Sequence, residues 1–315
     1  MLTVLFATRN RAGILQDVLE AFCGLESPAG GWKLVIVDNG STDRTAQVLT
    51  SYSGRLPLHS VLEQKLGKNS ALNAGLALAE GDLTVLTDDD VFPRSDWLVQ
   101  LRRAADQRTE YSIFGGAIKP RWEVPPPQWT KWIDLGPIFT VTPPSLKEGE
   151  LCFDALPIVQ GPNMAVRTSV LRSGNCFDPS IGPCGASYPM GSETEFVLRL
   201  GRQGHKAWHV QEAVVEHFIR AEQLDEGWVL QRAIRWGRGR YRMSPHVKLW
   251  MGIPRHVFRD LPKEVFLITA ARLFFRKPAL FRARWRLNIL RGKALEARLM
   301  AGEARVTAMQ PEPLR

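Results

Sequence analysis

The sequence predicts an α/β protein with a Rossmann-like, mostly parallel sheet, helices on both faces of that sheet, and a C-terminal helical extension. Three observations lead to this prediction. Apolar strands alternate with helical spacing four times in the first ninety residues, polar residues follow most of those strands, and basic residues gather in the last hundred. Uninterrupted apolar strands are typical of a parallel sheet that helices cover on both faces.

The first half of the predicted sheet alternates strand and helix. Strands are expected at Leu2–Ala7, Lys33–Val37, Leu58–Leu62 and Leu83–Thr87. Helical spacing occupies residues 12–23, Ala46–Leu49 and Ser70–Ala79, and Ser41 or Thr42 is expected to cap the second of these helices. Ligands of such sheets bind beyond the carboxyl ends of the strands. The polar segments Thr8–Arg11, Asp38–Asp43 and Asp88–Asp90 should therefore border one crevice.

The second half is less regular. A strand is expected at Tyr111–Lys119, and residues 120–157 are rich in proline and tryptophan, which is typical of a binding loop or lid. Helices are predicted from about Thr168 and from Gly191. Two strands, Lys206–Val210 and Ala213–Glu216, should end at His217, and the chain from about Leu224 is expected to be helical.

The composition is that of an ordinary globular protein. The 315 residues include 44% apolar and 23% charged side chains, which excludes a disordered chain, a collagen and a coiled coil. The longest apolar stretch, Val265–Phe275, contains Arg272 and is too short to cross a membrane. We find no signal-peptide pattern, and the four cysteines are scattered without a disulfide or zinc pattern. These features favour a reduced, cytoplasmic protein.

Charge is distributed unevenly along the chain. Residues 1–215 carry 20 basic and 23 acidic side chains, net −3, whereas residues 216–315 carry 21 basic and 9 acidic ones, net +12. Such an excess suits a phosphate-rich partner or, more simply, a solvated helical face. Residues 262–291 mix aromatic and basic side chains, which predicts peripheral attachment to an anionic membrane surface on its cytoplasmic face; an ordinary packed helical subdomain stays open as the alternative.

Three consecutive aspartates follow the fourth predicted strand. Like charges this close repel one another unless a cation joins them. A turn with a helix cap would explain one of Asp88, Asp89 and Asp90 but not all three. Oxygen ligands suit Mg²⁺ or Mn²⁺, and such an ion is seldom held by protein alone. The cluster therefore predicts a divalent metal that is shared with a phosphate-bearing ligand.

Seven short segments in order carry a resemblance to a known family. They are Ala7–Arg11, Val37–Asp43, Gly67–Asn69 with Asn73–Gly75, Thr87–Asp90 with Pro93, Gly161–Ala165, Gly191–Glu195 and His217. On these segments the chain resembles the family 2 glycosyltransferases with the GT-A fold, over roughly residues 1–245. The resemblance implies an inverting, metal-dependent enzyme that moves a sugar from a nucleoside diphosphate, UDP favoured, to a saccharide or lipid-linked hydroxyl.

The resemblance also implies roles for individual residues. Donor contacts are expected from Thr8, Arg9, Asn10, Asp38, Lys68 and Asp88, although the family often has an aromatic residue where Arg9 stands. Metal ligands are expected at Asp89, Asp90 and His217. Glu193 is the expected general base, with Glu195 as the alternative, because a glutamate here replaces the family's usual aspartate. Acceptor contacts are expected from Trp122, Gly161, Asn163 and Glu195.

The resemblance divides the chain into a catalytic domain and an extension. Residues 1–243 should form the catalytic domain, with a nucleotide-sugar half of about 1–119 and an acceptor half of about 120–243, and residues 244–315 a basic amphipathic extension. Three alternatives stay open. A nucleotidyltransferase would need a glycine-rich basic loop that Ala7–Gly13 lacks, a non-catalytic sugar-nucleotide binder would share the site, and a nucleic-acid-binding protein would leave the aspartates unexplained.

Overall fold

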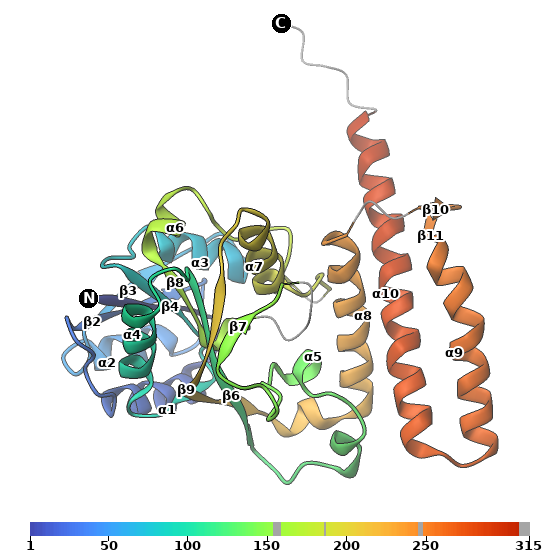
Figure 1. The fold of residues 1–315 in the computed structure, drawn as a ribbon, viewed down its shortest axis with the longest axis horizontal. Coiled ribbons are helices and arrows are strands. Elements are labelled where there is room, and N and C mark those ends of the chain that lie inside the picture. Colours follow the sequence, from blue (N-terminus) through green and yellow to red (C-terminus); the bar gives the residue numbers. More distant parts are fainter. Residues whose placement is uncertain (154–158, 186, 245–247, 309–315) are drawn as a thin grey trace, which may run out of the picture. The chain divides into compact units, whose positions relative to one another are not determined.

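The computed structural model describes residues 1–153, 159–185, 187–244 and 248–308. The chain divides into two compact units. The first consists of residues 1–124, 135–184 and 192–220, and the second of residues 125–134, 185–191 and 221–315. The second unit thus begins before the expected boundary at residue 244. Figure 1 gives the element labels used below.

The first unit is built on one large mixed sheet. Its strands are β1 (Leu2–Thr8), β2 (Trp32–Asp38), β3 (Leu58–Leu62), β4 (Leu83–Leu86), β5 (Val91–Pro93), β6 (Ile113–Trp122), β7 (Gly149–Leu151), β8 (Met164–Arg167) and β9 (Ala207–Ile219). They follow the order β3-β2-β1-β4-β8-β6-β9-β5, and β7 pairs with β9. The first four strands are parallel to one another, and β8 runs antiparallel to both β4 and β6.

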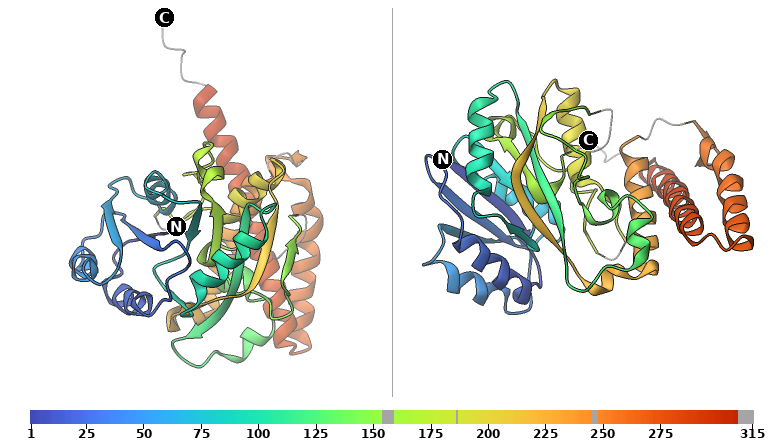
Figure 2. Two further views of the ribbon diagram at one scale, coloured as in Figure 1. Left: turned by 60° about the vertical axis from the view of Figure 1, so that its left-hand side comes forward. Right: turned by 60° about the horizontal axis from the view of Figure 1, so that its bottom comes forward.

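Helices cover both faces of this sheet (Figures 1 and 2). They are α1 (Ala12–Cys23), α2 (Thr45–Tyr52), α3 (Lys68–Leu76), α4 (Trp97–Gln107), α6 (Thr168–Arg172) and α7 (Ser192–Arg202). The unit also contains the short helix α5 (Gly136–Phe139). One core layer joins α1, α2 and α4 to the face that presents Val4 and Phe6, and a second joins α3, α6 and α7 to the face that presents Leu5. The predicted fold class, a mostly parallel sheet between helical layers, is confirmed.

Two local predictions were wrong. The two strands expected near residues 206–216 are one strand, β9, whose register against β6 shifts between Gly116 and Ala117. This irregularity explains why the sequence pattern looked interrupted. Neither Ser41 nor Thr42 caps α2; its N-cap is Arg44, and Asp43 Oδ1 instead accepts a hydrogen bond from Thr45 N at 3.0 Å.

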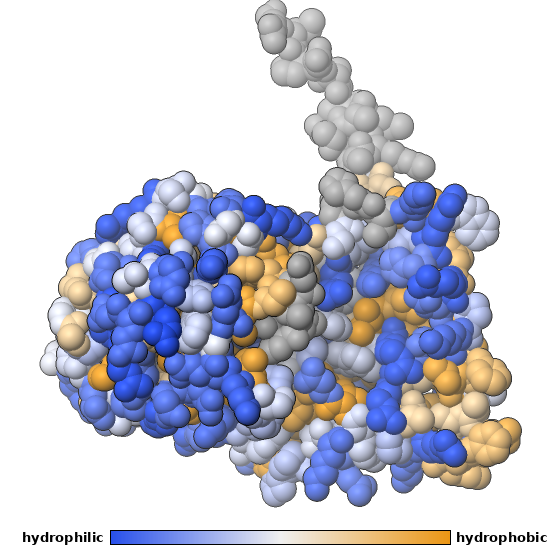
Figure 3. Space-filling view, in the orientation of Figure 1, coloured by the Kyte–Doolittle hydropathy of each residue, from blue (hydrophilic) through white to orange (hydrophobic). Residues whose placement is uncertain are grey.

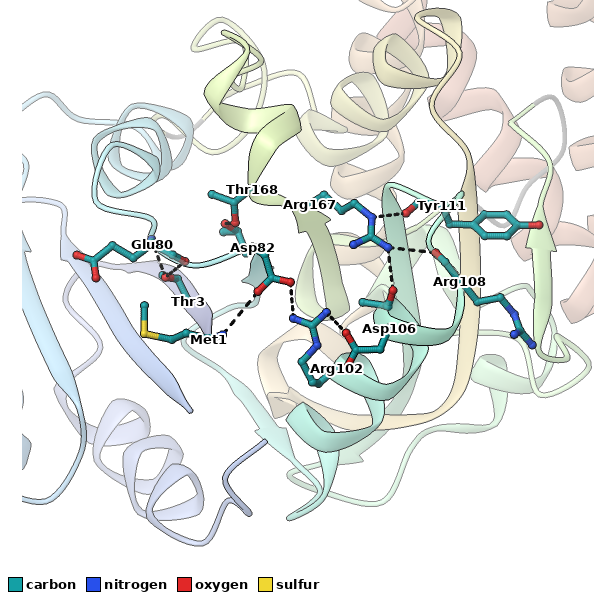
Figure 4. A network of polar contacts seen from close by, with 12 residues as sticks. Met1, Thr3, Glu80, Asp82, Arg102, Asp106, Arg108, Tyr111, Arg167 and Thr168 are labelled. Carbon is teal, nitrogen blue, oxygen red and sulfur yellow. Dashed lines mark hydrogen bonds and ion pairs between the residues drawn. The ribbon is translucent and has the colours of Figure 1, made fainter. Parts of the chain in front are cut away.

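A polar network stabilises the amino ends of the strands (Figure 4). The Asp82 carboxylate accepts a bond from Arg102 at 2.7 Å, and Arg102 also pairs with Asp106 at 2.5 Å. Arg167 donates from β8 to the carbonyl of Tyr111 at 2.7 Å. Since Asp82 precedes β4 while the aspartate cluster follows it, this network lies at the edge of the sheet away from the cluster. We interpret it as structural.

The second unit is mainly helical. It contains α8 (Glu226–Arg242), the short strands β10 (Leu249–Trp250) and β11 (Ile253–Pro254), α9 (Arg255–Leu273) and α10 (Lys277–Ala308), besides the 3-10 turns Gln128–Lys131 and Ala221–Leu224. The predicted C-terminal helical extension is therefore present. No helix among the described residues combines the length and apolar character needed to cross a membrane.

Helices α8 and α10 approach each other closely because glycine lies at their contact. A Cβ atom on Gly237 would stand 2.2 Å from the carbonyl oxygen of Ile289, and one on Gly292 would stand 2.1 Å from that of Ile234. The fully buried Glu296 of α10 accepts from Arg238 at 2.5 Å and also pairs with Arg242. Small residues and a paired buried charge thus hold this helix pair together.

Candidate active site

The carboxyl ends of β1, β2 and β4 meet at one edge of the sheet. Thr8 lies opposite Asp38 in the β1–β2 register, and Asp88 follows β4, which pairs with β1 on its other side. The short strand β5 then pairs with β9, with Val91 opposite His217. Strand pairing therefore brings Asp90 next to His217, two residues that are far apart in the chain.

Lys68 joins two carboxylates at this edge. Its Nζ atom lies 2.6 Å from Asp88 Oδ1 and 2.8 Å from Glu193 Oε1. Lys68 is the first residue of α3, and Glu193 lies in the first turn of α7, where Ser192 Oγ donates to its second oxygen at 2.8 Å. All three side chains are about four-fifths buried. The structure thus brings a buried glutamate to the aspartate cluster.

The charges of this group depend on one another. Burial alone raises the pKa of Glu193, but Lys68 outweighs burial and lowers the pKa to about 2. Burial also opposes the charged form of Lys68, yet its two carboxylate partners raise the Lys68 pKa. For Asp88, burial prevails over Lys68 and the pKa is raised. At neutral pH Glu193 is therefore an ionised carboxylate.

Asp89 points toward the end of β1. Its Oδ2 accepts a hydrogen bond from Thr8 Oγ1 at 2.8 Å. Burial, followed by repulsion from Asp90, raises the pKa of Asp89 to about 7, against the opposing charge of Arg11. Burial and the neighbouring aspartates thus both oppose the ionised form of Asp89.

Asp90 and His217 form a buried pair. His217 Nε2 lies 3.5 Å from Asp90 Oδ1, and Arg220 lies 3.6 Å from the other oxygen. Burial raises the pKa of Asp90, but His217 and the nearby arginines lower it to about 2. His217 Nδ1 lies 2.5 Å from the backbone oxygen of Phe139 and donates to it, which leaves Nε2 directed at Asp90. Burial lowers the pKa of His217, yet Asp90 more than compensates and raises it.

The loops after β1 and β2 are tied together. Asn10, which has a positive φ of 52°, accepts at Oδ1 from Thr42 N at 2.7 Å, and its own N–H donates to Ser41 Oγ at 3.0 Å. Asp38 is buried and accepts from Ser41 N at 2.9 Å, whereas Arg9 is exposed. The Asn10 side chain therefore orders the loops, and both Arg9 and Asn10 are exposed.

The residues expected on the acceptor side are not all at the cluster. Gly161 lies at the cluster, because a Cβ atom there would stand 2.6 Å from Glu193 Cγ and Oε1. Asn163 is fully buried and bonds Ala213 O, Ala117 O and Trp97 Nε1, so it packs in the core instead of facing an acceptor. Trp122 packs edge-on against Phe139 at 5.6 Å. Glu195 pairs with Arg199, four residues later in the same helix, at 2.8 Å.

Sequence reasoning missed two cations and one backbone group. Arg11 and Arg220 act electrostatically on Asp89 and Asp90, and the Phe139 carbonyl orients His217. Arg11 lies in the recognised Ala7–Arg11 segment and Arg220 follows His217 by three residues, so proximity to those segments was the available signal. The role of the Phe139 backbone depends on a tertiary contact, and no sequence pattern predicts it.

A mostly parallel sheet whose fourth strand is followed by an aspartate cluster is the arrangement of GT-A fold proteins. The chain belongs to glycosyl transferase family 2, whose sequence profile matches residues 3–174, more than half of the chain. It is 29% identical over 103 residues to a beta-monoglucosyldiacylglycerol synthase of Nostoc, covering 31% of this chain and 22% of that protein. It is 22% identical over 247 residues to the probable glycosyltransferase YdaM of Bacillus subtilis, covering 75% and 54%.

Solved structures support the fold over nearly the whole chain. A mannosyltransferase from Pyrobaculum calidifontis, in complex with GDP-Man and Mn²⁺, superposes with a TM-score of 0.63 at 19% identity and covers 94% of this chain and 86% of its own. TarS residues 1–349 of S. aureus, in complex with UDP-GlcNAc, superposes with a TM-score of 0.54 at 15% identity, covering 95% and 91%. The chain spans between about a fifth and a half of the length of the first curated relatives that it matches.

Proposed function

We propose that this chain is an inverting glycosyltransferase that moves a sugar from a nucleoside-diphosphate sugar to a hydroxyl group of a saccharide or lipid-linked acceptor. The observation that carries the proposal is the position of Glu193, whose carboxylate lies within 2.8 Å of the lysine that also binds Asp88. A buried, ionised carboxylate thus lies beside the acidic edge where family 2 members are expected to hold the donor diphosphate.

Glu193 is the proposed general base. It would accept the proton of the acceptor hydroxyl as the new bond forms at the anomeric carbon and the bond to the nucleoside diphosphate breaks on the opposite side, which inverts the configuration. Its low pKa keeps it ionised while Lys68 is paired with it. Glu195 suits the role less well because its carboxylate pairs with Arg199 of its own helix, whereas Glu193 is joined through Lys68 to the aspartate cluster.

The donor would lie across the ends of β1 and β2. Asp38 is suited to a base N–H or a ribose hydroxyl, and Thr8 and Asn10 border the same edge. Arg9 is exposed enough to stack on a base. Lys68 and Asp88 would meet the phosphate and ribose end. UDP is the favoured nucleotide, although the two structural neighbours named above were solved with GDP-Man and UDP-GlcNAc respectively.

Asp90 and His217 are the proposed metal ligands of this chain. Their oxygen and nitrogen atoms already face each other, and the Nδ1–H of His217 is held by a backbone carbonyl, as is usual for a metal-ligating histidine. Asp89 is the third candidate ligand; its Oδ2 accepts from Thr8, so the other oxygen would serve. Among the described residues no three acidic, histidine or cysteine side chains form a complete metal cage, so a diphosphate and water would complete the coordination. Bound Mn²⁺ or Mg²⁺ would stabilise the charge of the departing diphosphate.

The acceptor would reach Glu193 past Gly161 and Trp122. The absence of a side chain at Gly161 leaves room for Glu193, since a Cβ atom there would collide with it. Two curated relatives are named for lipid-related substrates, a beta-monoglucosyldiacylglycerol synthase and an undecaprenyl-phosphate 4-deoxy-4-formamido-L-arabinose transferase. These names support a lipid-linked acceptor.

A thermal-shift panel tests the donor site directly. UDP, GDP, CDP and dTDP are each added with Mn²⁺ and with EDTA, because a ligand that binds only the folded state raises the Tm by mass action. We expect a metal-dependent rise with one diphosphate, which Asp90→Asn abolishes. No rise with any diphosphate would overturn the donor assignment. Glu193→Gln should keep the rise and lose transfer, whereas a non-catalytic binder would show no transfer in the wild type either.

A further inference from the structure

The turn between α9 and α10 exposes a group of large apolar side chains. Leu273 is 71% exposed, Phe274 is 67% exposed and Phe275 is 91% exposed. In Figure 3 an orange area covers the end of the molecule where Figure 1 places this turn. A contiguous exposed apolar area of this kind marks a site of interaction.

The backbone of this turn is one that glycine favours. Helix α9 ends with hydrogen bonds from Phe275 N to Arg272 O at 3.2 Å and from Arg276 N to Ala271 O at 2.8 Å. These two bonds define a Schellman motif, whose left-handed position is usually glycine. Here Phe275 occupies that position with a φ of 53°. An aromatic residue is thus held, almost fully exposed, in a conformation that glycine would adopt more easily, which indicates a role outside folding.

The outer face of α9 continues the apolar surface. Phe258, Leu261, Val265 and Phe266 are all exposed, and their spacing places them along one side of the helix with Leu273. The opposite side is buried through Val257, Glu264 and Ala271, which repeat every seven residues. The helix therefore has one face packed within its own unit, which includes the paired Glu264, and a second face with apolar side chains open to solvent.

The surroundings of the turn are strongly basic. Residues 265–295 contain eight basic side chains and no acidic one. Arg272, Arg276 and Lys277 are exposed and flank the turn. Nearby, Asp260 is paired with Arg259 at 2.8 Å and Glu264 with Arg286 at 2.8 Å, so both acidic side chains of α9 already have a cation. The turn thus combines apolar side chains with a net positive charge.

We propose that the α9–α10 turn inserts into the surface of an anionic lipid bilayer. Leu273, Phe274 and Phe275 would lie below the headgroups, and Arg272, Arg276 and Lys277 would bind the lipid phosphates. Exposed aromatic and aliphatic side chains beside several cations are the combination that favours an interface over water. The charge complementarity selects a membrane over a second copy of this chain, whose matching turn would repel this one. The inference does not depend on the proposed reaction.

Vesicle sedimentation with the full chain tests the proposal without any donor or acceptor. The wild type should sediment with phosphatidylglycerol-containing vesicles and much less with pure phosphatidylcholine. Phe274→Asp/Phe275→Asp should weaken binding at least about tenfold, because two inserted rings are lost. Arg276→Glu/Lys277→Glu should weaken it similarly and reduce its dependence on salt. Leu299→Asp, at an exposed leucine far along α10, is the matched control and should bind like the wild type.

A glycine variant separates binding from folding. Phe275→Gly removes the aromatic ring and places the favoured residue in the left-handed position, so the Tm should stay equal or rise while vesicle binding falls. A structural role for Phe275 would instead lower the Tm. The proposal would be overturned if the Phe274→Asp/Phe275→Asp variant bound anionic vesicles as strongly as the wild type does. An absence of binding together with a dimer that these substitutions dissociate would also overturn it.

Discussion

Lys68 and Glu193 lie 125 positions apart in the chain, yet their side chains meet at 2.8 Å. Lys68 also meets Asp88 at 2.6 Å, so a single ammonium group neutralises part of two acidic residues. Helix α3 supplies the cation and helix α7 supplies the glutamate, both from the same face of the sheet. The relationship connects the residue proposed as the base with the residues proposed to bind the donor.

Replacing Lys68 should therefore disable the site. In Lys68→Met the two carboxylates lose their shared cation, so they repel each other and Glu193 no longer keeps its position. We expect kcat/KM for sugar transfer to fall at least about 100-fold, with a smaller loss in Lys68→Arg. Steady-state transfer assays with the donor identified by thermal shift measure this. Lys65→Met, at an exposed lysine three residues earlier, is the control, and equal losses in both variants would contradict the assignment.

Gly161 should tolerate no side chain. A Cβ atom would stand 2.6 Å from Glu193, so Gly161→Ala must displace that carboxylate. Misplacing a catalytic group by about 1 Å costs on the order of 100-fold in rate. We expect kcat to fall by that order, while the diphosphate-induced rise in Tm is kept. Gly13→Ala, where a Cβ atom meets nothing within 4 Å, should behave as the wild type. Unchanged kcat in Gly161→Ala would argue against Glu193 as the base.

Glu296 should stabilise the second unit strongly. Its fully buried carboxylate pairs with Arg238 and Arg242, so Glu296→Ala removes the negative charge that faces two largely buried guanidinium groups. Removing one member of a buried ion pair costs about 3–5 kcal/mol of unfolding free energy. Glu226→Ala breaks the exposed pair with Arg284 and should cost about 1 kcal/mol or less. Urea unfolding compares the two variants, and similar losses would show that burial is not the cause.

His209 should make stability depend on pH. Burial lowers its pKa in the folded state, despite a hydrogen bond with the Gly115 backbone that raises it. The unfolded chain takes up a proton near the ordinary histidine pKa of about 6.5, whereas His209 in the folded chain takes it up only at a lower pH. The contribution of His209 is therefore complete above about pH 6.5 and declines as the pH falls below it, by at most about 1.4 kcal/mol per unit.

Substitution isolates this contribution from the other titrating groups. Urea unfolding gives the free energy of unfolding of the wild type and of His209→Gln at pH 7.5 and at pH 5.5. When the pH is lowered, the wild type should lose more of this free energy than the variant does. A difference for His209→Gln that does not change with pH would contradict the assignment.

The local sequence pattern predicts the regular part of the fold. Strands β1, β2, β3 and β4 and helix α1 lie within a residue or so of their predicted bounds, because each is a continuous apolar or amphipathic segment bounded by polar residues. Strand β9 was predicted as two pieces, since an irregular pairing with β6 interrupts its apolar pattern. The grouping of α8 with α9 and α10 also escaped prediction, because it depends on which helices pack together.

The sequence by itself determined the class of fold, the family and the set of polar residues at the strand ends, because strands and their following turns are encoded locally. Only the tertiary structure decided how those residues combine. It joined Lys68 to Glu193, paired Asp90 with His217, buried Asn163 in the core and paired Glu195 with Arg199. These relationships follow from strand register and helix packing between segments far apart in the chain, and the local pattern around each residue does not contain them.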